Sequence, residues 1–158
     1  MQLYFFRHAL AEIADGSMPD EERKLTQEGI VRTRHTVRLL KLLGITPTRL
    51  FTSPLTRARQ TADILGHTLE IAVQVRKELS PGFSLAAITS LTRDLGMEDS
   101  VIFVGHEPDF SHIISTLTGG GQVVMKKGGL ARVDVTGYHP LTGELVWLIA
   151  PKVFHKLG

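Results

Sequence analysis

The sequence contains no cysteine among its 158 residues. Disulfides, thiolate zinc sites and cysteine nucleophiles are therefore excluded. An excess of positive charge is also missing, because 18 lysine and arginine residues stand against 16 aspartate and glutamate residues, for a formal net charge of +2. A balance this close to neutral gives no indication of nucleic-acid binding.

Long hydrophobic runs are absent as well. No apolar stretch approaches the ~20 residues that span a bilayer, and the amino terminus lacks the basic start, apolar run and cleavage site of a secretory signal. We therefore expect a cytoplasmic protein that does not associate with membranes. The length predicts one domain over residues 1–158, built around a single core.

The first apolar stretch ends on a charged pair. Residues 3–6 form a short aliphatic and aromatic run without a helical period, which is typical of a central strand covered on both faces. Arg7 and His8 follow directly. Ligands of open α/β sheets bind at the carboxyl ends of the strands, so this pair is a candidate site. Taken alone, the pair is equally well explained as the place where a strand reaches water.

Three more predicted strands also lead into polar or ionisable residues. Runs of apolar and β-branched residues predict strands over 50–52, 71–75 and 101–104. The residues that follow these strands are, in order, Ser53 with Arg57, Glu78, and His106 with Glu107. Parallel strands joined by right-handed crossovers bring such ends to one edge of the sheet. We therefore expect these side chains to converge.

The segments between the strands complete the predicted fold. A polar stretch over 12–24 is expected to be a surface loop leading away from the site, and Ser53-Pro54 is expected to start a helix that Gly66 ends. The other helices are predicted from Thr26 to Gly44, over 84–95 and over 108–117. Two further strands, over 130–135 and 145–149, are predicted to form a hairpin. The result is an α/β fold of three α/β/α layers, with a mostly parallel central sheet and antiparallel edge strands from the C-terminal hairpin.

The residues expected at the sheet edge suit a phosphoryl group. Two arginines, two histidines and two helix amino termini form a positive concavity that complements phosphate. Positive neighbours lower the pKa of His8, so that its neutral ring is available to attack phosphorus. Arg7, Arg57 and His106 would stabilise charge on the nonbridging oxygens, which needs neither a metal nor a cofactor.

A metal site is the competing interpretation of the two histidines. His8 and His106 would share a cation with Glu78 or Glu107. Two arginines at the same edge would repel that cation, so we expect no metal.

Four motifs in order carry a resemblance to a known family. They are Arg7-His8-Ala9 in place of Arg-His-Gly, Arg23-Lys24-Leu25-Thr26 followed by Gly29, SPLTRARQTA over 53–62, and VGHEPD over 104–109. With these motifs the chain resembles the histidine phosphatase superfamily, also called phosphoglycerate mutase-like, and is most similar to its SixA-type phosphohistidine phosphatase branch. The resemblance covers most of the chain.

The resemblance implies a role for each matching residue. His8 would be the phosphorylated nucleophile, Arg7 and Arg57 would clamp the phosphate, and His106 would complete the pocket. Arg57 is chosen over Arg59 because it is in register with the Ser-Pro-x-x-Arg pattern. The implied activity is hydrolysis of phosphohistidine on a protein, such as a histidine phosphotransfer domain. A small phosphorylated metabolite as substrate, or a phosphate-binding module without turnover, are the alternatives.

The resemblance leaves the general acid open. Relatives that cleave phosphate esters take it from a loop after the third strand or from the residue after the second histidine. Glu78 holds the first position, Glu107 the second, where it would also contact substrate, and Asp109 is a third candidate. Phosphohistidine has a labile P–N bond and a good leaving group, so its hydrolysis needs an acid less.

Overall fold

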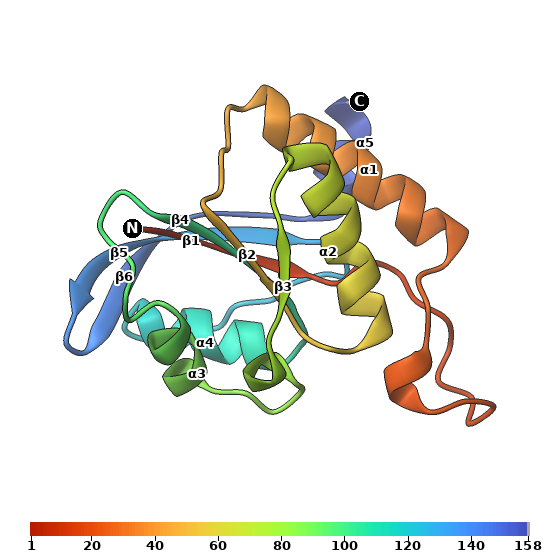
Figure 1. Cartoon of the computed structure of the whole chain (residues 1–158), viewed down its shortest axis with the longest axis horizontal. Helices are drawn as coiled ribbons and strands as arrows, with labels where there is room; N and C mark the ends of the chain where they lie inside the picture. The colour runs from red at the N-terminus through yellow and green to blue at the C-terminus, as the bar shows by residue number, and fades with distance from the viewer. Residues whose placement is uncertain (158) are drawn as a thin grey trace.

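The computed structural model describes residues 1–157 and is built on one six-stranded sheet in the order β3-β2-β4-β1-β5-β6 (Figure 1). The strands are β1 (Gln2–Arg7), β2 (Arg49–Thr52), β3 (Val73–Val75), β4 (Ser100–Gly105), β5 (Leu130–Tyr138) and β6 (Leu141–Ile149). The first four are parallel, whereas β5 runs antiparallel to β1 and forms a hairpin with β6. The predicted mixed sheet with an antiparallel edge is confirmed.

Helices cover both faces of this sheet, as predicted. One face carries α1 (Gln27–Leu42), α2 (Thr56–Leu69) and α5 (Pro151–Leu157), and the other carries α3 (Leu85–Leu91) and α4 (Asp109–Leu117) (Figure 1). Two short 3-10 segments, η1 (Asp20–Glu22) and η2 (Lys77–Leu79), lie in the connections. The helix α5 has no counterpart in the sequence predictions.

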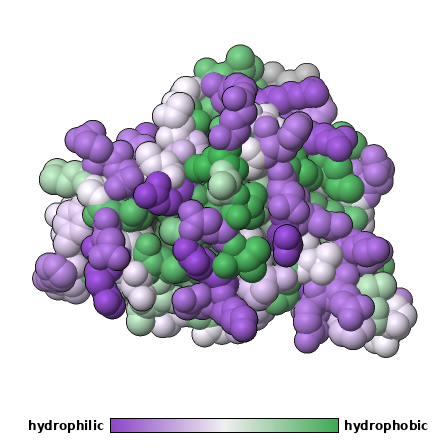
Figure 2. Space-filling view, viewed as in Figure 1, coloured by the Kyte–Doolittle hydropathy of each residue, from purple (hydrophilic) through white to green (hydrophobic). Residues whose placement is uncertain are grey.

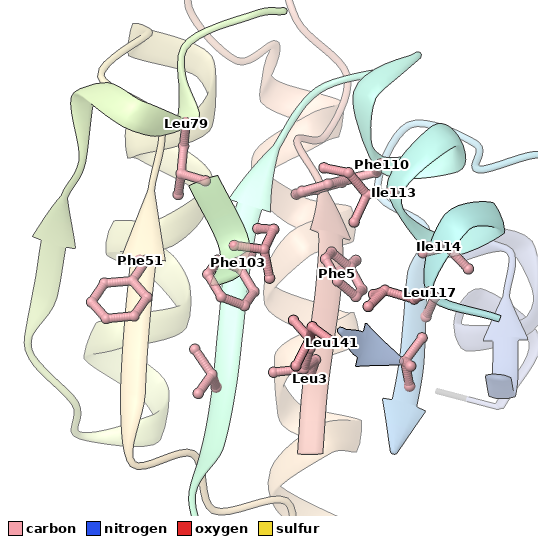
Figure 3. Close-up of a cluster of buried hydrophobic side chains, with 14 of the residues drawn as sticks. Leu3, Phe5, Phe51, Leu79, Phe103, Phe110, Ile113, Ile114, Leu117 and Leu141 are labelled. Carbon is pink, nitrogen blue, oxygen red and sulfur yellow. The ribbon is translucent and has the colours of Figure 1, made fainter. Parts of the chain in front are cut away.

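The central strand β1 is buried on both of its faces. Leu3 and Phe5 belong to the core under α4, where Phe5 lies 5.3 Å from the ring of Phe110, centroid to centroid (Figure 3). Tyr4 and Phe6 belong to the core under α1 and α2. This double coverage explains why the strand reads as a continuous apolar run and not as an alternating one.

The boundaries of α2 differ from the prediction at both ends. The helix begins at Thr56, two residues after Pro54, and the hydroxyl of Ser53 contacts both the Leu55 N–H and His106. It also continues through Gly66 to Leu69. A Cβ at Gly66 would lie 2.8 Å from the Ile71 carbonyl oxygen, so the glycine permits close packing on the chain that leads into β3. It does not end the helix.

The start of α1 follows the prediction closely. The Thr26 hydroxyl accepts from the Gly29 N–H at 3.0 Å, which makes Thr26 the N-cap. The Thr26 N–H donates to the carbonyl of Leu10 at 2.9 Å. A Cβ at Gly29 would lie only 2.2 Å from that carbonyl oxygen. The helix therefore approaches the chain after β1 at a distance that only glycine allows.

We expect Gly29→Ala to lower the free energy of unfolding by about 2 kcal/mol, because the added methyl displaces the Leu10 backbone. Urea unfolding measures the loss. Gly96→Ala is the matched control, since a Cβ there would come no closer than 3.8 Å to the Asp99 carboxylate. Equal unfolding midpoints for the two variants would contradict the close approach.

The surface mixes polar and apolar side chains. Figure 2 shows hydrophilic side chains spread over one face, with hydrophobic ones visible between them. Within residues 1–157, no helix combines the length and apolar character needed to cross a membrane.

Candidate active site

The carboxyl ends of three adjacent strands bring the predicted residues together. Parallel pairing sets Arg7 of β1 opposite Gly105 of β4, and the His8 N–H continues it by donating to the Gly105 carbonyl at 3.0 Å. The Ser53 N–H donates to the Val104 carbonyl at the same distance. The residues that follow β1, β2 and β4 therefore share one edge of the sheet.

His8 is held in one orientation by hydrogen bonds to both ring nitrogens. Its Nδ1 lies 2.8 Å from the Ala9 carbonyl oxygen, which can only accept, so Nδ1 carries the proton. The Arg57 Nε–H donates to Nε2 at 3.3 Å. Nε2 is therefore the unprotonated atom, whose lone pair can act as a nucleophile.

Burial keeps the His8 ring neutral. The side chain is 6% exposed, and burial is the main cause that lowers its pKa from 6.5 to about 3. The positive charges of Arg57 and Arg7 and the neighbouring His106 lower the pKa further, against a hydrogen bond to Ala9 that raises it. The predicted direction is correct, but burial contributes more than the arginines.

Arg57 is buried beside His8, in contrast to the exposed Arg59 two residues later. Its Nη1 donates to the Asp20 backbone carbonyl at 2.7 Å and its Nη2 to the Asp20 carboxylate at 2.9 Å. The other oxygen of that carboxylate accepts from Nε and Nη2 of Arg23 at 2.8 and 2.6 Å. One carboxylate thus bridges two arginines, and both hold the pKa of Asp20 below its usual range.

The sequence predicted that the segment over 12–24 leads away from the site, and this prediction is wrong. Arg23 anchors it by donating from Nη1 to the Glu12 carbonyl at 2.7 Å, and Asp20 reaches Arg57 across 37 residues of sequence. The polar composition of the segment correctly predicted a surface loop. Its return to the site depends on this long-range ion pair, which no local pattern reveals.

His106 faces His8 from the end of β4. The ring centroids lie 5.2 Å apart, and His106 is 3% exposed. Its Nε2 lies 2.8 Å from the Ser53 hydroxyl, whereas Nδ1 has no partner among the described residues. Burial, followed by the charge of Arg57, lowers the pKa of His106 from 6.5 to about 4, while Asp20 opposes this shift.

Arg7 contributes the second guanidinium near His8. Its Nη1 donates to the Met125 carbonyl at 2.7 Å. Burial lowers the pKa of Arg7, and the carboxylate of Glu107 opposes that effect. Glu107 itself accepts from the backbone N–H of Ser111 at 3.1 Å and from its hydroxyl. The arrangement places one carboxylate within the electrostatic reach of Arg7.

Comparison with known proteins identifies the family. A model of the histidine phosphatase superfamily (branch 1) matches residues 3–81, which is half of the chain. An uncharacterized protein of Picosynechococcus sp. is 37% identical over 136 residues, covering 82% of each chain. The chain belongs to the histidine phosphatase superfamily.

Solved structures of similar proteins agree with this membership. The structure of the protein histidine phosphatase SixA complexed with tungstate superposes with a TM-score of 0.86 and 25% identity, over 97% of this chain and 99% of that one. A mycobacterial glucosyl-3-phosphoglycerate phosphatase gives a TM-score of 0.73 at 16% identity, over 92% and 96%. The second similarity shows the shared fold alone.

The remaining acid candidates of this superfamily member lie in different surroundings. Glu78 is exposed in η2, after the edge strand β3. Asp109 is 8% exposed and accepts from the Gly82 N–H at 2.8 Å, which ties the loop after η2 to the start of α4. A role as general acid stays a prediction for Glu78 and Glu107, while Asp109 has a structural contact.

Two further features bear on the motif predictions. Among the non-glycine residues described, only Glu70 has a positive φ, so Ala9 occupies the position of the usual glycine without strain. In the same part of the chain, no three histidine, aspartate or glutamate side chains gather in a way that could hold a metal ion. A reaction without metal stays a prediction.

Three residues of the site have no functional role among the predictions from the sequence. Asp20 lies in the stretch over 12–24 that was predicted as a surface loop, Arg23 belongs to a motif without a predicted task, and Ser53 was expected at the sheet edge and at a helix start without a task in the chemistry. The motif that contains Arg23 is the feature of the sequence that could have indicated a place in the site for Asp20 and Arg23. For Ser53, the signal was its place at the end of a strand, where its hydroxyl meets His106.

The two buried histidines predict a loss of stability in mild acid. An unfolded histidine titrates near 6.5, against about 3 for His8 and about 4 for His106 in the folded chain. The contribution of the two neutral histidines to the free energy of unfolding is fully present above pH 6.5. It is lost as pH falls towards 4, because in that range only the histidines of the unfolded chain take up protons. In this range the free energy of unfolding is expected to fall by about 1.4 kcal/mol per pH unit for each histidine.

Urea unfolding across this pH range measures the slope. His8→Gln should lose about half of it, because one of the two depressed histidines is gone. An unchanged slope in His8→Gln would show that His8 does not stay neutral in the folded protein.

Proposed function

We propose that the protein is a phosphatase that hydrolyses phosphohistidine on a protein, such as a histidine phosphotransfer domain, through a covalent phospho-His8 intermediate. The observation that carries the proposal is the state of His8: the Ala9 carbonyl holds the proton on Nδ1, and Nε2 lies beside Arg57 with its lone pair available. We further propose that residues 1–158 act as one domain and need no metal ion.

The reaction proceeds in two displacements. The lone pair of His8 Nε2 forms a bond to phosphorus, while the P–N bond to the substrate histidine breaks and its electron pair stays on the leaving nitrogen. Water then attacks phosphorus, the bond to His8 breaks with its electron pair returning to Nε2, and inorganic phosphate leaves. Arg7, Arg57 and His106 stabilise the nonbridging oxygens in both steps.

Binding of the phosphoryl group requires a change at Arg57. Its Nη1 and Nη2 are both occupied by Asp20. Because the side chain of Asp20 is 54% exposed, it lies at the rim of the site, where an entering phosphoryl group can replace it on the guanidinium. A dianionic phosphoryl group competes well for this position, since it offers arginine more charge than one carboxylate.

The choice of a protein substrate is supported by the similarity to SixA, whose solved structure is that of a protein histidine phosphatase. A specific observation favours a small phosphate ester as the second candidate. Glu107 lies close enough to Arg7 to affect its pKa, so a carboxyl group stands near the phosphate clamp. Protonation of a departing alkoxide would require such a group.

Substrate profiling distinguishes these functions. The native protein, Glu78→Gln and Glu107→Gln are assayed on a phosphohistidine-labelled phosphotransfer domain and on an aryl phosphate, with EDTA present throughout. We expect the phosphohistidine reaction to be the faster one and to change by less than about threefold in either variant, because its leaving group needs little protonation.

Two outcomes would reject the proposal. A faster reaction on the ester, reduced about 100-fold in one of the variants, would identify a phosphomonoesterase and its acid. Saturable phosphate binding without turnover of either substrate would identify a binding module. Loss of all activity in EDTA would contradict the metal-free mechanism alone.

A further inference from the structure

Ser53 is a buried hydroxyl to which neither the family motifs nor the proposed mechanism gives a task. It follows β2 directly, is fully buried, and is fixed by its backbone N–H to the Val104 carbonyl. It does not cap α2, because that helix has Leu55 as its N-cap and no side-chain hydrogen bond there. Its hydroxyl contacts His106 instead.

The direction of the hydrogen bond between Ser53 and His106 follows from counting protons. A serine hydroxyl has one proton to donate and two lone pairs to accept with. The Leu55 N–H donates to the Ser53 oxygen at 3.3 Å, so one lone pair is used. His106 Nε2, at 2.8 Å, is the acceptor within reach of the hydroxyl proton among the described residues.

The reverse arrangement leaves a buried donor unpaired. If His106 Nε2 carried the proton, the Ser53 oxygen would accept twice, and its own proton would have no acceptor in a fully buried position. An unmade hydrogen bond of this kind costs about 1–3 kcal/mol. Donation from Ser53 to Nε2 places the single proton of the neutral His106 ring on Nδ1 and leaves one buried group without a partner, Nδ1–H, whereas the reverse arrangement leaves two, the Ser53 hydroxyl proton and the Nδ1 lone pair.

The proton on Nδ1 then has no partner within the described protein. Nδ1 of His106 is buried and makes no hydrogen bond, while its ring faces His8 with 5.2 Å between centroids. The neutral state of the ring is supported by its lowered pKa of about 4. An unpaired donor on a ring that lies beside the nucleophile is the arrangement expected of a group that awaits an anionic acceptor.

We propose that Ser53 is a positioning residue: its hydroxyl donates to Nε2 of His106, fixes the proton on Nδ1, and thereby makes Nδ1–H a donor to a nonbridging oxygen of the transferring phosphoryl group. This inference rests on the proposed function, because the phosphoryl group is the acceptor. Without the hydroxyl, nothing in the contacts of Nε2 ties the proton to Nδ1. The other tautomer would turn a lone pair of Nδ1 towards the anion and repel it.

The direct test is the tautomer of His106 in the native protein. Long-range proton–nitrogen NMR at pH 7 distinguishes a protonated ring nitrogen from an unprotonated one. We expect His106 to carry its proton on Nδ1 and the Nδ1–H resonance to shift when tungstate is added. Ser53→Ala should give a mixture of tautomers or the Nε2–H form. An Nε2–H tautomer in the native protein would overturn the proposal.

A kinetic test separates positioning from general structural support. Ser53→Ala should slow the phosphorylation of His8 in a single turnover by about 10–100-fold, with a much smaller change in KM, because the lost donor acts in the transition state. Ser53→Thr retains a hydroxyl and should recover part of the rate. Ser100→Ala is the matched control, since Ser100 is also buried but its hydroxyl has no partner in the described chain.

A native phosphorylation rate in a folded Ser53→Ala would overturn the proposal. If Ser53→Ala does not fold, the tautomer of the native protein decides. If the protein turns over no phosphorylated substrate, the proposed function fails, and the tautomers of the native protein and of Ser53→Ala still show whether Ser53 sets the proton of His106. The two failures are therefore distinguishable.

Discussion

Replacing His8 by alanine is expected to lower the rate of phosphohistidine hydrolysis by about 10⁴-fold, because the covalent route loses its nucleophile. The substitution removes the unprotonated nitrogen that accepts from the Arg57 Nε–H. The native protein, quenched during turnover with a radiolabelled phosphohistidine protein, should carry label that is labile in acid and stable in base. His8→Ala should carry none.

The matched control is His112→Ala, which removes an exposed histidine of α4. This variant should keep both the rate and the label. Label of the same intensity on His8→Ala would place the intermediate on another residue. Turnover by the native protein without any acid-labile label would show that water attacks the substrate directly.

Arg57→Lys is expected to lower kcat/KM by about 100- to 1,000-fold, although the positive charge is kept. Arginine presents a rigid fork, and in this site Nε contacts His8 while both Nη atoms point to the position held by Asp20. A lysine ammonium cannot reproduce three contacts in this geometry. Because Arg57→Lys keeps the positive charge near His8, its loss of kcat/KM measures how much the orientation of the arginine donors contributes.

Arg59→Lys is the control, because Arg59 lies on the same helix but is exposed. Its kcat/KM should stay within about twofold of the native value, as expected for surface positions. Similar losses in both variants would show that the helix as a whole, and not the Arg57 fork, supports the reaction. Urea unfolding of both variants excludes a general loss of structure.

The sequence predicted those parts of the molecule that depend on local pattern and strand direction. The apolar run of β1 indicated a strand buried on both faces, and His8 and His106 follow neighbouring parallel strands, as their positions suggested. These relations could be predicted because parallel strands must end at a common edge. Arg57 could be chosen over Arg59 from the motif, and its burial agrees with that choice.

The features that the sequence did not predict depend on contacts between distant segments. Ser53-Pro54 is a normal helix start by local preference, but the hydroxyl of Ser53 contacts His106, and the helix begins later. Gly66 is a normal helix end, yet it is required by packing against Ile71. In each case, a residue with a strong local preference has a tertiary partner that overrides it.

Under the proposed function, the bridge from Asp20 to Arg57 and Arg23 makes phosphoryl binding an exchange of one anion for another. The measured affinity for any ligand then reflects the difference between its contacts to Arg57 and the Asp20 contacts that it replaces. Ligands that match a carboxylate only in charge gain little from this exchange. We expect affinity to rise for a group with more charge and more acceptor oxygens, and we expect the return of Asp20 to the guanidinium to favour release of inorganic phosphate in the proposed reaction.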